Sequence, residues 1–321
     1  MEHRRLGASA LQVSALCLGT MNFGPRTAEA DAHRILDAAL DAGIDFVDTA
    51  DQYGGVLGEG VTESIIGRWL AARPSRRDRI VLATKVHEPM GEGPNERGLS
   101  ARHIRDACDA SLRRLGVDHV DLYQMHHIDR AASPAEVWEA MDRLHAEGKI
   151  SYVGTSNFPG FEIARYDEHA RARGRLGLVS EQSLYHLLER RVELEVLPAC
   201  ERYGLGFVVW SPLAGGLLAG PPEAGAQRRT SDAAREARSR HRAAIEGFEA
   251  LAAELGRTPA TLAHAWLLAR PGVTATIVGP ATIEQLESVL GAVELALPEA
   301  ALARLDELFP PCGPAPEAYA W

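Results

Sequence analysis

Short apolar runs that each end in polar or aromatic residues recur along this chain of 321 residues. The clusters begin at Asp48 with Tyr53, Lys85, His126, Ser156-Asn157, Gln182, Trp210-Ser211 and Gly279. The first six start about 26 to 41 residues apart, and one strand–helix unit occupies roughly 30 residues. Reactive side chains at the exits of successive parallel strands are the way in which a (β/α)8 barrel assembles an active site. The spacing therefore predicts an enzyme of the α/β class.

Eight parallel strands are predicted, because eight apolar runs alternate with helical patterns and parallel sheets are covered by helices. With 46% hydrophobic residues the chain can bury such a core, and we expect one domain, a (β/α)8 TIM barrel, over residues 1–321. An N-terminal β-hairpin within residues 4–16 should cap the bottom of the barrel, and a C-terminal helix plus tail should follow the last strand. The predicted strands span residues 15–19, 44–48, 80–85, 120–125, 150–155, 178–182, 206–210 and 276–278.

Two helix starts are marked by capping patterns. Ser133 stands three residues before Glu136, and Thr282 stands three residues before Gln285. In a capping box the first side chain accepts from the backbone of the second residue, and the second side chain reaches back to the first backbone N–H. We expect this reciprocal pair at both helices.

The irregular segments are expected to decide specificity. Residues 213–233 form a long, glycine-rich stretch, and loops of that length in compact domains are often functional lids. The loops at 52–60 and 88–98 should border the same mouth of the barrel. The proline-rich tail, residues 310–321, either folds over the mouth or is disordered.

Charge and cysteine usage exclude several classes of function. The formal net charge is −10, which disfavours a partner with a phosphate backbone. The four cysteines are spread singly without a C-x-x-C pair, which predicts a reducing compartment and no disulfide frame or structural zinc. We see no secretory signal and no apolar run of the roughly 20 residues that span a bilayer. We therefore expect a cytoplasmic protein that binds neither nucleic acid nor membrane.

Four of the strand-end residues together form a proton donor. An ammonium such as Lys85 beside the phenol of Tyr53 favours the phenolate and lowers its pKa from about 10. The carboxylate of Asp48 can hold that lysine in place and keep it charged. The imidazole of His126 can orient a carbonyl oxygen, so that the four protonate an alkoxide as it forms. Each residue alone has a structural explanation; their order on consecutive strand ends favours catalysis.

The same residues belong to longer strings. These strings are Leu18-Gly19-Thr20-Met21, Asp48-Thr49-Ala50 with Tyr53-Gly54, Lys85, His126, Gly154-Thr155-Ser156-Asn157-Phe158, Glu181-Gln182, Trp210-Ser211-Pro212-Leu213 and Gly279 with Glu284-Gln285-Leu286. With them the chain resembles the aldo-keto reductase superfamily over nearly its whole length. The resemblance implies Tyr53 as general acid, Lys85 as its partner, Asp48 as the partner of Lys85, and His126 as the residue that orients the carbonyl.

A nicotinamide cofactor is implied by the resemblance as well. Ser156, Asn157 and Gln182 would bind the carboxamide, Trp210 would stack on the nicotinamide ring, and backbone N–H groups of residues 211–216 would wrap the pyrophosphate. The absence of G-x-G-x-x-G excludes a Rossmann site and is expected in this family. The implied cofactor-binding residues are Gly19, Thr20, Met21, Asp48, Ser156, Asn157, Gln182, Trp210, Ser211, Pro212, Leu213, Gly215, Gly216, Gly279, Ala281 and Gln285.

The sequence departs from the resembled pattern where a 2′-phosphate would be held. Ala281 stands where the family often has arginine, Ser288-Val289 where it often has Glu-Asn, and Gly220 is followed by Pro221 in place of a lysine. An arginine of the stretch 228–229 is an alternative cation. NADPH is therefore expected from the resemblance, and NADH is not excluded.

A metal site is the competing interpretation of one strand end. Asp121, His126, His127 and Asp129 could be read as ligands in a barrel hydrolase. However, no H-x-H pair accompanies them, and Tyr53 would then have no role. We therefore expect no metal, and His127 is assigned to the substrate pocket or the surface.

The predicted function is NAD(P)H-dependent reduction of a ketone or aldehyde, a small-molecule carbonyl substrate. The strings at residues 22–25, 156–160 and 181–185 are similar to actinobacterial reductases of nucleotide-deoxysugar pathways, which implies a keto-deoxysugar in antibiotic biosynthesis. His126 favours carbonyl over enone reduction. Two alternatives stay open: a cofactor-binding regulatory subunit resembling potassium-channel β subunits, and a broad aldehyde-detoxifying reductase. The sequence leaves a homo-oligomer open.

Overall fold

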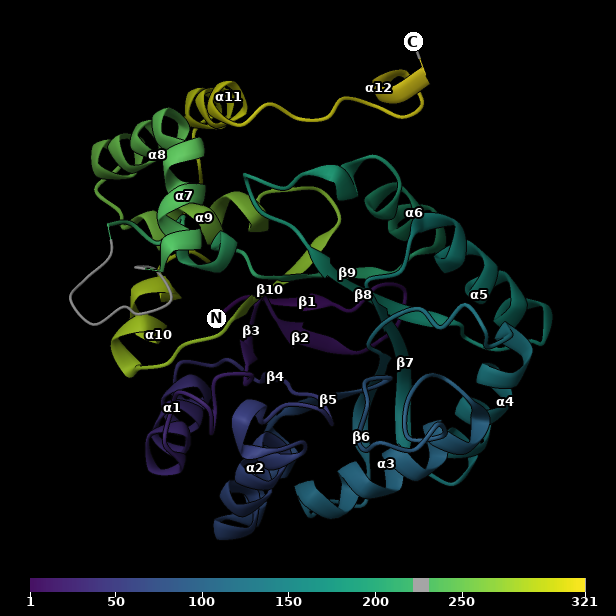
Figure 1. Cartoon of the computed structure of the whole chain (residues 1–321). Helices are drawn as coiled ribbons and strands as arrows, with labels where there is room; N and C mark the ends of the chain where they lie inside the picture. The colour runs from purple at the N-terminus through teal and green to yellow at the C-terminus, as the bar shows by residue number, and fades with distance from the viewer. Residues whose placement is uncertain (222–230, 321) are drawn as a thin grey trace.

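The structure is a computed structural model that describes residues 1–221 and 231–320. Within these residues eight strands close into a barrel in the order β10-β3-β4-β5-β6-β7-β8-β9, and all neighbours are parallel. Helices surround the barrel (Figure 1), which confirms the predicted fold. The barrel strands are β3 (Leu16–Gly19), β4 (Phe46–Asp48), β5 (Val81–Val86), β6 (Val120–Met125), β7 (Ile150–Ser156), β8 (Leu178–Leu184), β9 (Gly206–Trp210) and β10 (Val273–Val278).

Strand pairing extends several strands beyond the predicted bounds. The strands β6 and β9 begin and end as predicted. In β8 the ladder continues to Leu184, which pairs with Trp210, and β10 already begins at Val273, which pairs with Phe207. The neighbouring strand supplies hydrogen-bond partners there, and no periodicity within one segment reveals such a partner.

The ring of helices covers the outside of the barrel. One helix follows each strand from β3 to β8, and three helices lie between β9 and β10 among the residues that the structure describes. No helix among the described residues is long and apolar enough to cross a membrane. The helices are α1 (Glu29–Asp41), α2 (Val61–Ala72), α3 (Ala101–Leu115), α4 (Pro134–Ala146), α5 (Gly160–Ala172), α6 (Val196–Tyr203), α7 (Asp232–Arg240), α8 (Arg242–Glu254), α9 (Pro259–Leu268), α10 (Ile283–Leu290), α11 (Glu299–Leu308) and α12 (Glu317–Ala320), with 3-10 turns η1 (Gly55–Leu57), η2 (Pro74–Arg79), η3 (Arg191–Glu193) and η4 (Ala214–Gly216).

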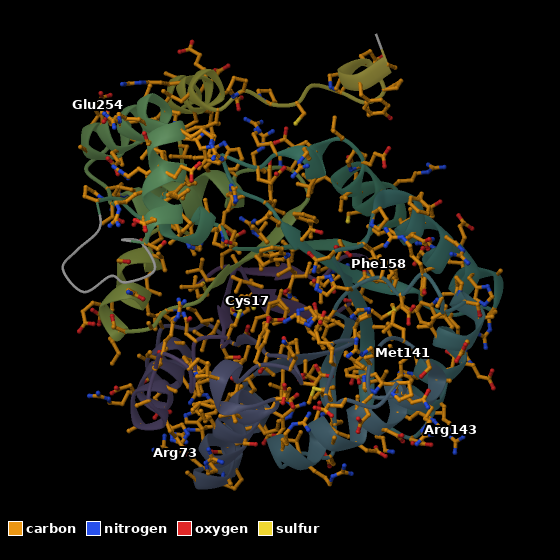
Figure 2. The ribbon with its side chains drawn as sticks, in the orientation of Figure 1. Cys17, Arg73, Met141, Arg143, Phe158 and Glu254 are labelled. Carbon is orange, nitrogen blue, oxygen red and sulfur yellow. The ribbon has the colours of Figure 1, made fainter. Side chains whose placement is uncertain are left out.

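The core has two parts, one inside the barrel and one between barrel and helices. Cys17 belongs to the inner cluster, whereas Met141 of α4 lies in the outer one and Arg143 points outward (Figure 2). The N-terminal hairpin pairs β1 (His3–Arg5) antiparallel to β2 (Gln12–Ser14). Its residues Leu6 and Val13 join the inner cluster, which confirms the predicted cap on the bottom of the barrel.

The two capping boxes are formed only in half. Ser133 Oγ accepts from Glu136 N at 3.2 Å, and Thr282 Oγ1 accepts from Gln285 N at 3.4 Å. The reciprocal bonds are absent, because Glu136 Oε1 accepts from Ala101 N of the neighbouring helix and Gln285 Oε1 accepts from Ala281 N. The prediction was wrong on this point because another backbone N–H takes the carboxylate or amide oxygen, from the neighbouring helix at Glu136 and from the preceding residue at Gln285.

The C-terminal tail leaves the barrel at its edge. Arg190, in the loop after β8, donates to Phe309 O at 2.8 Å and to Asp306 Oδ1 at 2.6 Å. From there the tail runs along the periphery of the helix ring to α12 and does not cross the barrel centre (Figure 1). Of the two alternatives stated for this tail, a cover over the mouth is therefore not formed. The middle part of the expected lid, residues 222–230, lies outside the described residues.

Candidate active site

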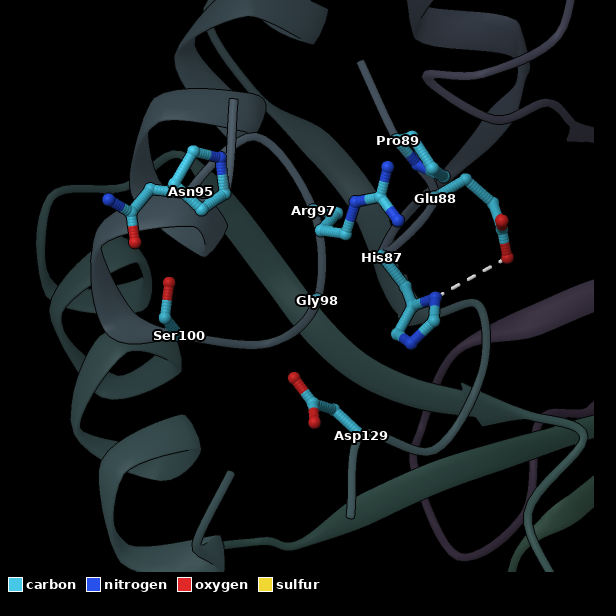
Figure 3. Close-up of a pocket in the computed structure, with 9 residues that line it drawn as sticks. His87, Glu88, Pro89, Asn95, Arg97, Gly98, Ser100 and Asp129 are labelled. Atoms are coloured by element: carbon cyan, nitrogen blue, oxygen red, sulfur yellow. Dashed lines mark hydrogen bonds and ion pairs between the residues drawn. The ribbon is translucent and has the colours of Figure 1, made fainter. Parts of the chain in front are cut away.

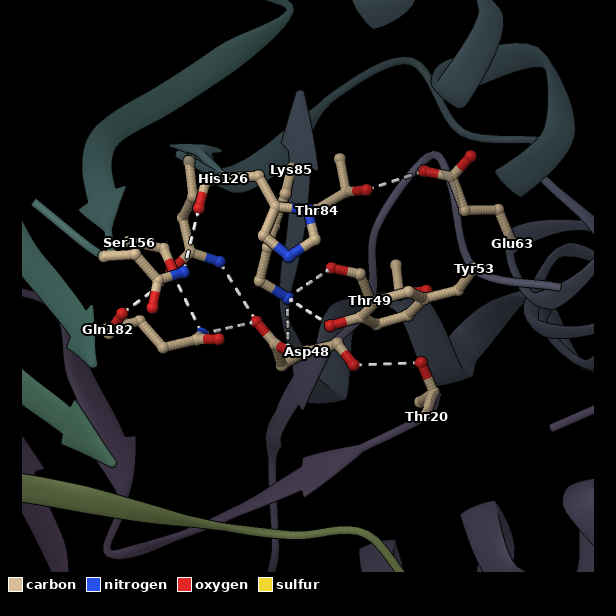
Figure 4. Close-up of polar contacts among 12 residues, drawn as sticks. Thr20, Asp48, Thr49, Tyr53, Glu63, Thr84, Lys85, His126, Ser156 and Gln182 are labelled. Atoms are coloured by element: carbon tan, nitrogen blue, oxygen red, sulfur yellow. Dashed lines mark hydrogen bonds and ion pairs between the residues drawn. The ribbon is translucent and has the colours of Figure 1, made fainter. Parts of the chain in front are cut away.

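Lys85 lies at the centre of the candidate site. It is on β5 and fully buried. Its Nζ donates to Asp48 Oδ2 at 2.6 Å, to Thr49 O at 2.9 Å and to Tyr53 Oη at 3.2 Å (Figure 4). An ammonium has three protons to donate, so these three oxygens satisfy it completely. The structure thus brings together three of the residues predicted from the strand ends.

Asp48 is held by two glutamines as well as by the lysine. Its Oδ1 accepts from Gln124 Nε2 at 3.0 Å and from Gln182 Nε2 at 2.9 Å. Gln124 is buried on β6, two residues before His126, and so it faces the same side of its strand. Our sequence analysis missed Gln124. The signal was available: Gln124 is a polar residue two positions after Leu122, whose side chain belongs to the core inside the barrel.

The pKa of Tyr53 departs from the sequence-based expectation. Burial raises the pKa of this phenol, while the charge of Lys85 lowers it, and burial prevails. The expected shift toward neutrality is therefore wrong for the protein alone, because removal of water disfavours the phenolate. Burial also lowers the pKa of Lys85, but the charges of Asp48 and Tyr53 outweigh it and raise this pKa. At neutral pH the site holds a protonated phenol beside a charged ammonium.

His126 is neutral in this environment. Burial, together with the nearby charge of Lys85, lowers its pKa to about 2. Its ring meets the ring of Tyr53 edge-on, with 5.9 Å between centroids. Its Nδ1 is buried and has no partner among the described residues. A neutral imidazole next to the phenol suits a group that orients a carbonyl oxygen.

His127 stacks on His126 and faces the rim. The two rings are nearly parallel, with 5.1 Å between centroids. His127 Nε2 lies 3.2 Å from Glu88 Oε1, and His87 Nδ1 lies 3.3 Å from the same oxygen. Asp121 instead pairs with Arg77 at 2.9 Å. Among residues 1–221 and 231–320 no group of His, Cys, Asp or Glu side chains is arranged to hold a metal ion.

The residues expected at the carboxamide form one network around Asn157. Asn157 Nδ2 donates to His126 O and to Ser156 Oγ, both at 3.0 Å. Its Oδ1 accepts from Trp210 Nε1 at 3.0 Å. Ser156 Oγ in turn donates to Gln182 O at 2.8 Å. The ends of β6, β7, β8 and β9 are therefore joined by side chains from residues far apart in the sequence.

Gln182 leaves an acceptor for the carboxamide. Its amide nitrogen is used by Asp48 and Gln124, whereas its Oε1 accepts no hydrogen bond from the described residues. A carboxamide N–H₂ can donate to this oxygen. The residues present therefore fit a nicotinamide amide at this point of the rim.

The segment after β9 has the backbone conformation expected of an anion-binding loop. Positive φ angles occur at Ser211, Ala214, Gly215 and Gly216. However, the N–H groups of Ala214 and Gly216 donate to carbonyls within the segment, and that of Gly215 donates to Ser211 Oγ. A pyrophosphate would have to compete for these donors. Pro212 has no N–H, and a role for it and Leu213 in cofactor binding stays a prediction.

The remaining predicted cofactor residues lie along the β3 and β10 exits. Asn22 Nδ2 donates to Gly279 O at 2.8 Å, and Thr27 Oγ1 donates to Ala281 O at 3.2 Å. At Gly19 a Cβ would lie 2.4 Å from Ile277 Cγ2, so only glycine lets these two strands approach. Thr20 Oγ1 donates to Asp48 O at 2.9 Å, whereas Met21 is 53% exposed at the rim.

Comparison with known proteins agrees with this geometry. The family model described as "Aldo/keto reductase family" matches residues 15–309. The chain is 50% identical to an uncharacterized oxidoreductase, YrpG, of Bacillus subtilis (strain 168), over 100% of both chains. It is 32% identical to a putative aryl-alcohol dehydrogenase of Schizosaccharomyces pombe over 95% of both chains. It is also 32% identical to a probable voltage-gated potassium channel subunit beta of Arabidopsis thaliana, over 99% of this chain and 100% of that protein.

The match covers nearly the whole chain, including the barrel and the strand exits that carry the site. The predicted resemblance is thereby confirmed. The chain belongs to the aldo/keto reductase family and is an NAD(P)-dependent oxidoreductase.

Proposed function

We propose that this protein reduces a carbonyl group and that Tyr53 donates the proton. The observation that carries this is the chain of contacts from Tyr53 Oη through Lys85 Nζ to Asp48 Oδ2, at 3.2 and 2.6 Å. Bound NADPH would supply the hydride. A phenol that is protonated at neutral pH and hydrogen-bonded to an ammonium can release its proton to an alkoxide, because the ammonium stabilises the phenolate that is left. His126, neutral and beside the phenol, orients the carbonyl oxygen.

NADPH is the proposed cofactor, with NADH as the alternative. Ser156, Asn157 and Gln182 would hold the carboxamide, and Trp210, fixed by its bond to Asn157, would offer a ring face to the nicotinamide. For the 2′-phosphate, the alternative arginines at 228–229 lie outside the described residues. Another cation is Arg26, which is exposed and forms no ion pair within the described part of the chain; the hydroxyl of the next residue, Thr27, binds Ala281 O.

The pocket next to the histidines supports a polar substrate. A cavity of about 430 Å³ lies between the loop after β5 and Asp129 (Figure 3). His87 connects it to the site, since its ring contacts His127, which stacks on His126. Two carboxylates, one amide and one guanidinium group are among the side chains that line the cavity, and such groups recognise hydroxylated or charged ligands. This lining favours a nucleotide-linked keto-deoxysugar over simple apolar aldehydes.

Tyr53→Phe tests the proposal, with Tyr123→Phe as the matched control. Tyr123 is a buried tyrosine of β6 whose hydroxyl donates to Ile104 O, away from the site. We expect Tyr53→Phe to lower kcat by about 10²- to 10⁴-fold, the usual contribution of general acid catalysis, with the Kd for NADPH within about twofold of wild type. Retained turnover in Tyr53→Phe would rule out Tyr53 as the donor.

The substrate is tested by single-turnover oxidation of bound NADPH with a panel of carbonyl compounds. Fast oxidation by a nucleotide 4-keto sugar but not by simple aldehydes would support the deoxysugar assignment. Fast oxidation by simple aldehydes would support the broad detoxifying reductase. Tight cofactor binding without oxidation by any carbonyl would favour a regulatory subunit.

The free cysteines, three of them buried, support a reducing, cytoplasmic location.

A further inference from the structure

Glu181 is a buried carboxylate that the proposed proton transfer does not use. It lies on β8 directly before Gln182 and is fully buried. In the part of the chain that the structure describes, it forms no ion pair, and its Oε2 has no hydrogen-bond partner. A buried carboxylate without a cation costs free energy of folding. A cost of this kind beside the cofactor residues suggests a functional reason for the residue.

The other oxygen of Glu181 fastens the loop that follows β7. Glu181 Oε1 accepts from Phe158 N at 3.2 Å and from Ser183 Oγ at 2.6 Å. Phe158 is itself buried and meets the ring of Tyr166 edge-on, with 5.3 Å between centroids. The carboxylate therefore joins β8 to the residue that directly follows Asn157.

The anchor adjoins a residue with an uncommon backbone conformation, Asn157. Its φ is 60°, a left-handed value that is rare in non-glycine residues, although asparagine adopts it more readily than most. Its N–H donates to Gln182 O at 3.0 Å. In this conformation the side chain reaches both His126 O and Trp210 Nε1. The conformation of Asn157 thus connects the end of β6 to the end of β9.

We propose that Glu181 is a positioning residue for the nicotinamide site: by binding Phe158 N and Ser183 Oγ, its carboxylate holds Asn157 in the conformation that links His126 to Trp210. This inference rests on the proposed function. The group acts through Asn157 and touches neither substrate nor cofactor. Loss of the anchor weakens cofactor binding, since the carboxamide residues are then no longer held in place before binding.

The charge of Glu181 makes this anchor sensitive to pH. Burial raises the pKa of Glu181 to about 7, against the hydrogen bonds from Ser183, Thr155 and the backbone, which lower it. From the neighbouring helix α6 the titratable group that faces it is Cys200, whose pKa is raised by burial and then by the Glu181 charge. The ionised carboxylate accepts hydrogen bonds more strongly than the acid. Cofactor affinity should therefore fall as the pH decreases through 7.

Fluorescence titration of the whole protein at pH 8 and pH 6 tests this, using NADPH and NADH because a phosphate monoester itself titrates near pH 6. A single proton with a pKa near 7 weakens binding by at most about tenfold over this interval. We expect Glu181→Gln to bind the cofactor more weakly than wild type at pH 8. We also expect the ratio of Kd at pH 6 to Kd at pH 8 to be at least threefold smaller in Glu181→Gln than in wild type. An equal pH dependence in wild type and Glu181→Gln would overturn the proposal.

Two further variants separate the anchor from general destabilisation. Asp167→Asn is the matched control, because Asp167 is a buried carboxylate that accepts from Leu178 N at the start of the same strand; an equal loss of affinity in this variant contradicts the proposal. Ser183→Ala keeps the carboxylate but removes one hydrogen bond to its ionised form, so the midpoint of the pH dependence should move upward. An unmoved midpoint contradicts the role of Glu181.

Three results distinguish a failure of the proposed function from a failure of the proposed role of Glu181. A wild-type protein that binds neither NADPH nor NADH overturns both the proposed function and the role of Glu181. A protein that binds the cofactor with pH-independent affinity and still reduces carbonyls overturns only the role of Glu181. Cofactor binding that follows the predicted pH dependence without any turnover overturns the reductase proposal and leaves the anchor in place.

Discussion

Replacing Asp48 by Asn tests how the buried lysine is held. Lys85 is fully buried and Asp48 is its carboxylate partner. In Asp48→Asn the new carbonyl can still accept from Gln124 and Gln182, which donate to Oδ1. The new amide N–H₂ then faces Lys85 Nζ, so that two donors meet. The ammonium keeps Thr49 O and Tyr53 Oη but loses its only counter-charge among the described residues.

The size of the effect follows from this loss. Breaking one side of a buried ion pair typically destabilises by about 3–5 kcal/mol, because the remaining charge is buried unpaired. Burial then prevails and lowers the pKa of Lys85 below its unfolded value of about 10.4. A lysine with a lowered folded pKa binds fewer protons when folded than when unfolded. The variant should therefore become more stable as the pH rises from the lowered pKa to about 10.4.

The wild type should show no such gain. Burial lowers the pKa of Lys85, but Asp48 and Tyr53 outweigh it and raise this pKa. The stabilisation from a raised pKa is complete below the unfolded value and is lost only as the pH rises through the folded value. Between pH 7 and 9 the contribution of Lys85 to the free energy of unfolding is then constant in wild type and rises in Asp48→Asn.

Urea denaturation followed by circular dichroism measures both effects at pH 7 and pH 9. Lys85→Met and the double variant complete a double-mutant cycle. We expect the double variant to be more stable than Asp48→Asn, because it no longer buries an unpaired ammonium. A loss below about 1 kcal/mol in Asp48→Asn, or strictly additive effects in the cycle, would refute the reasoning.

Two other predictions concern pH and cofactor choice. At saturating cofactor and substrate, kcat for reduction should be independent of pH from about 5 to 9, since burial keeps the pKa of His126 near 2 and raises that of Tyr53; activity then falls only at alkaline pH, where the phenol loses its proton. A limb near pH 6.5 in the kcat profile would show that His126 titrates normally. Ala281→Arg should tighten NADPH relative to NADH by about 10- to 150-fold, the worth of one charge-assisted hydrogen bond to phosphate. Arg26→Ala should weaken NADPH binding. Unchanged ratios of the two Kd values would place the phosphate elsewhere.

Much of the site could be predicted because its parts lie at strand exits. Asp48, Lys85 and His126 each end an apolar run, and parallel strands of a closed barrel bring those ends to one rim. Gln124 was not predicted because it lies within β6 and not at the strand end. Spacing did not reveal that the capping boxes form only in half. The oxygens of Glu136 and Gln285 accept from the backbone N–H groups of Ala101 and Ala281, which are not members of the two capping boxes.

The pKa of Tyr53 is a property that reasoning from the sequence did not predict correctly. The sequence places a lysine near the phenol and so predicts a lower pKa. The burial that outweighs this charge depends on how completely the barrel mouth excludes water, which no local pattern encodes. The same holds for Glu181, whose pKa of about 7 reflects burial without a cation.

The sequence by itself determined the barrel and the residues at its exits, because hydrophobic periodicity and the spacing of strand–helix units are local properties of the chain. The tertiary structure alone decided the partners and the protonation states. Gln182 binds Asp48 across 134 residues, and Asn157 joins Trp210 across 53. Such bonds, and the exclusion of water that shifts the pKa of Tyr53 and His126, exist only once the barrel has closed around them.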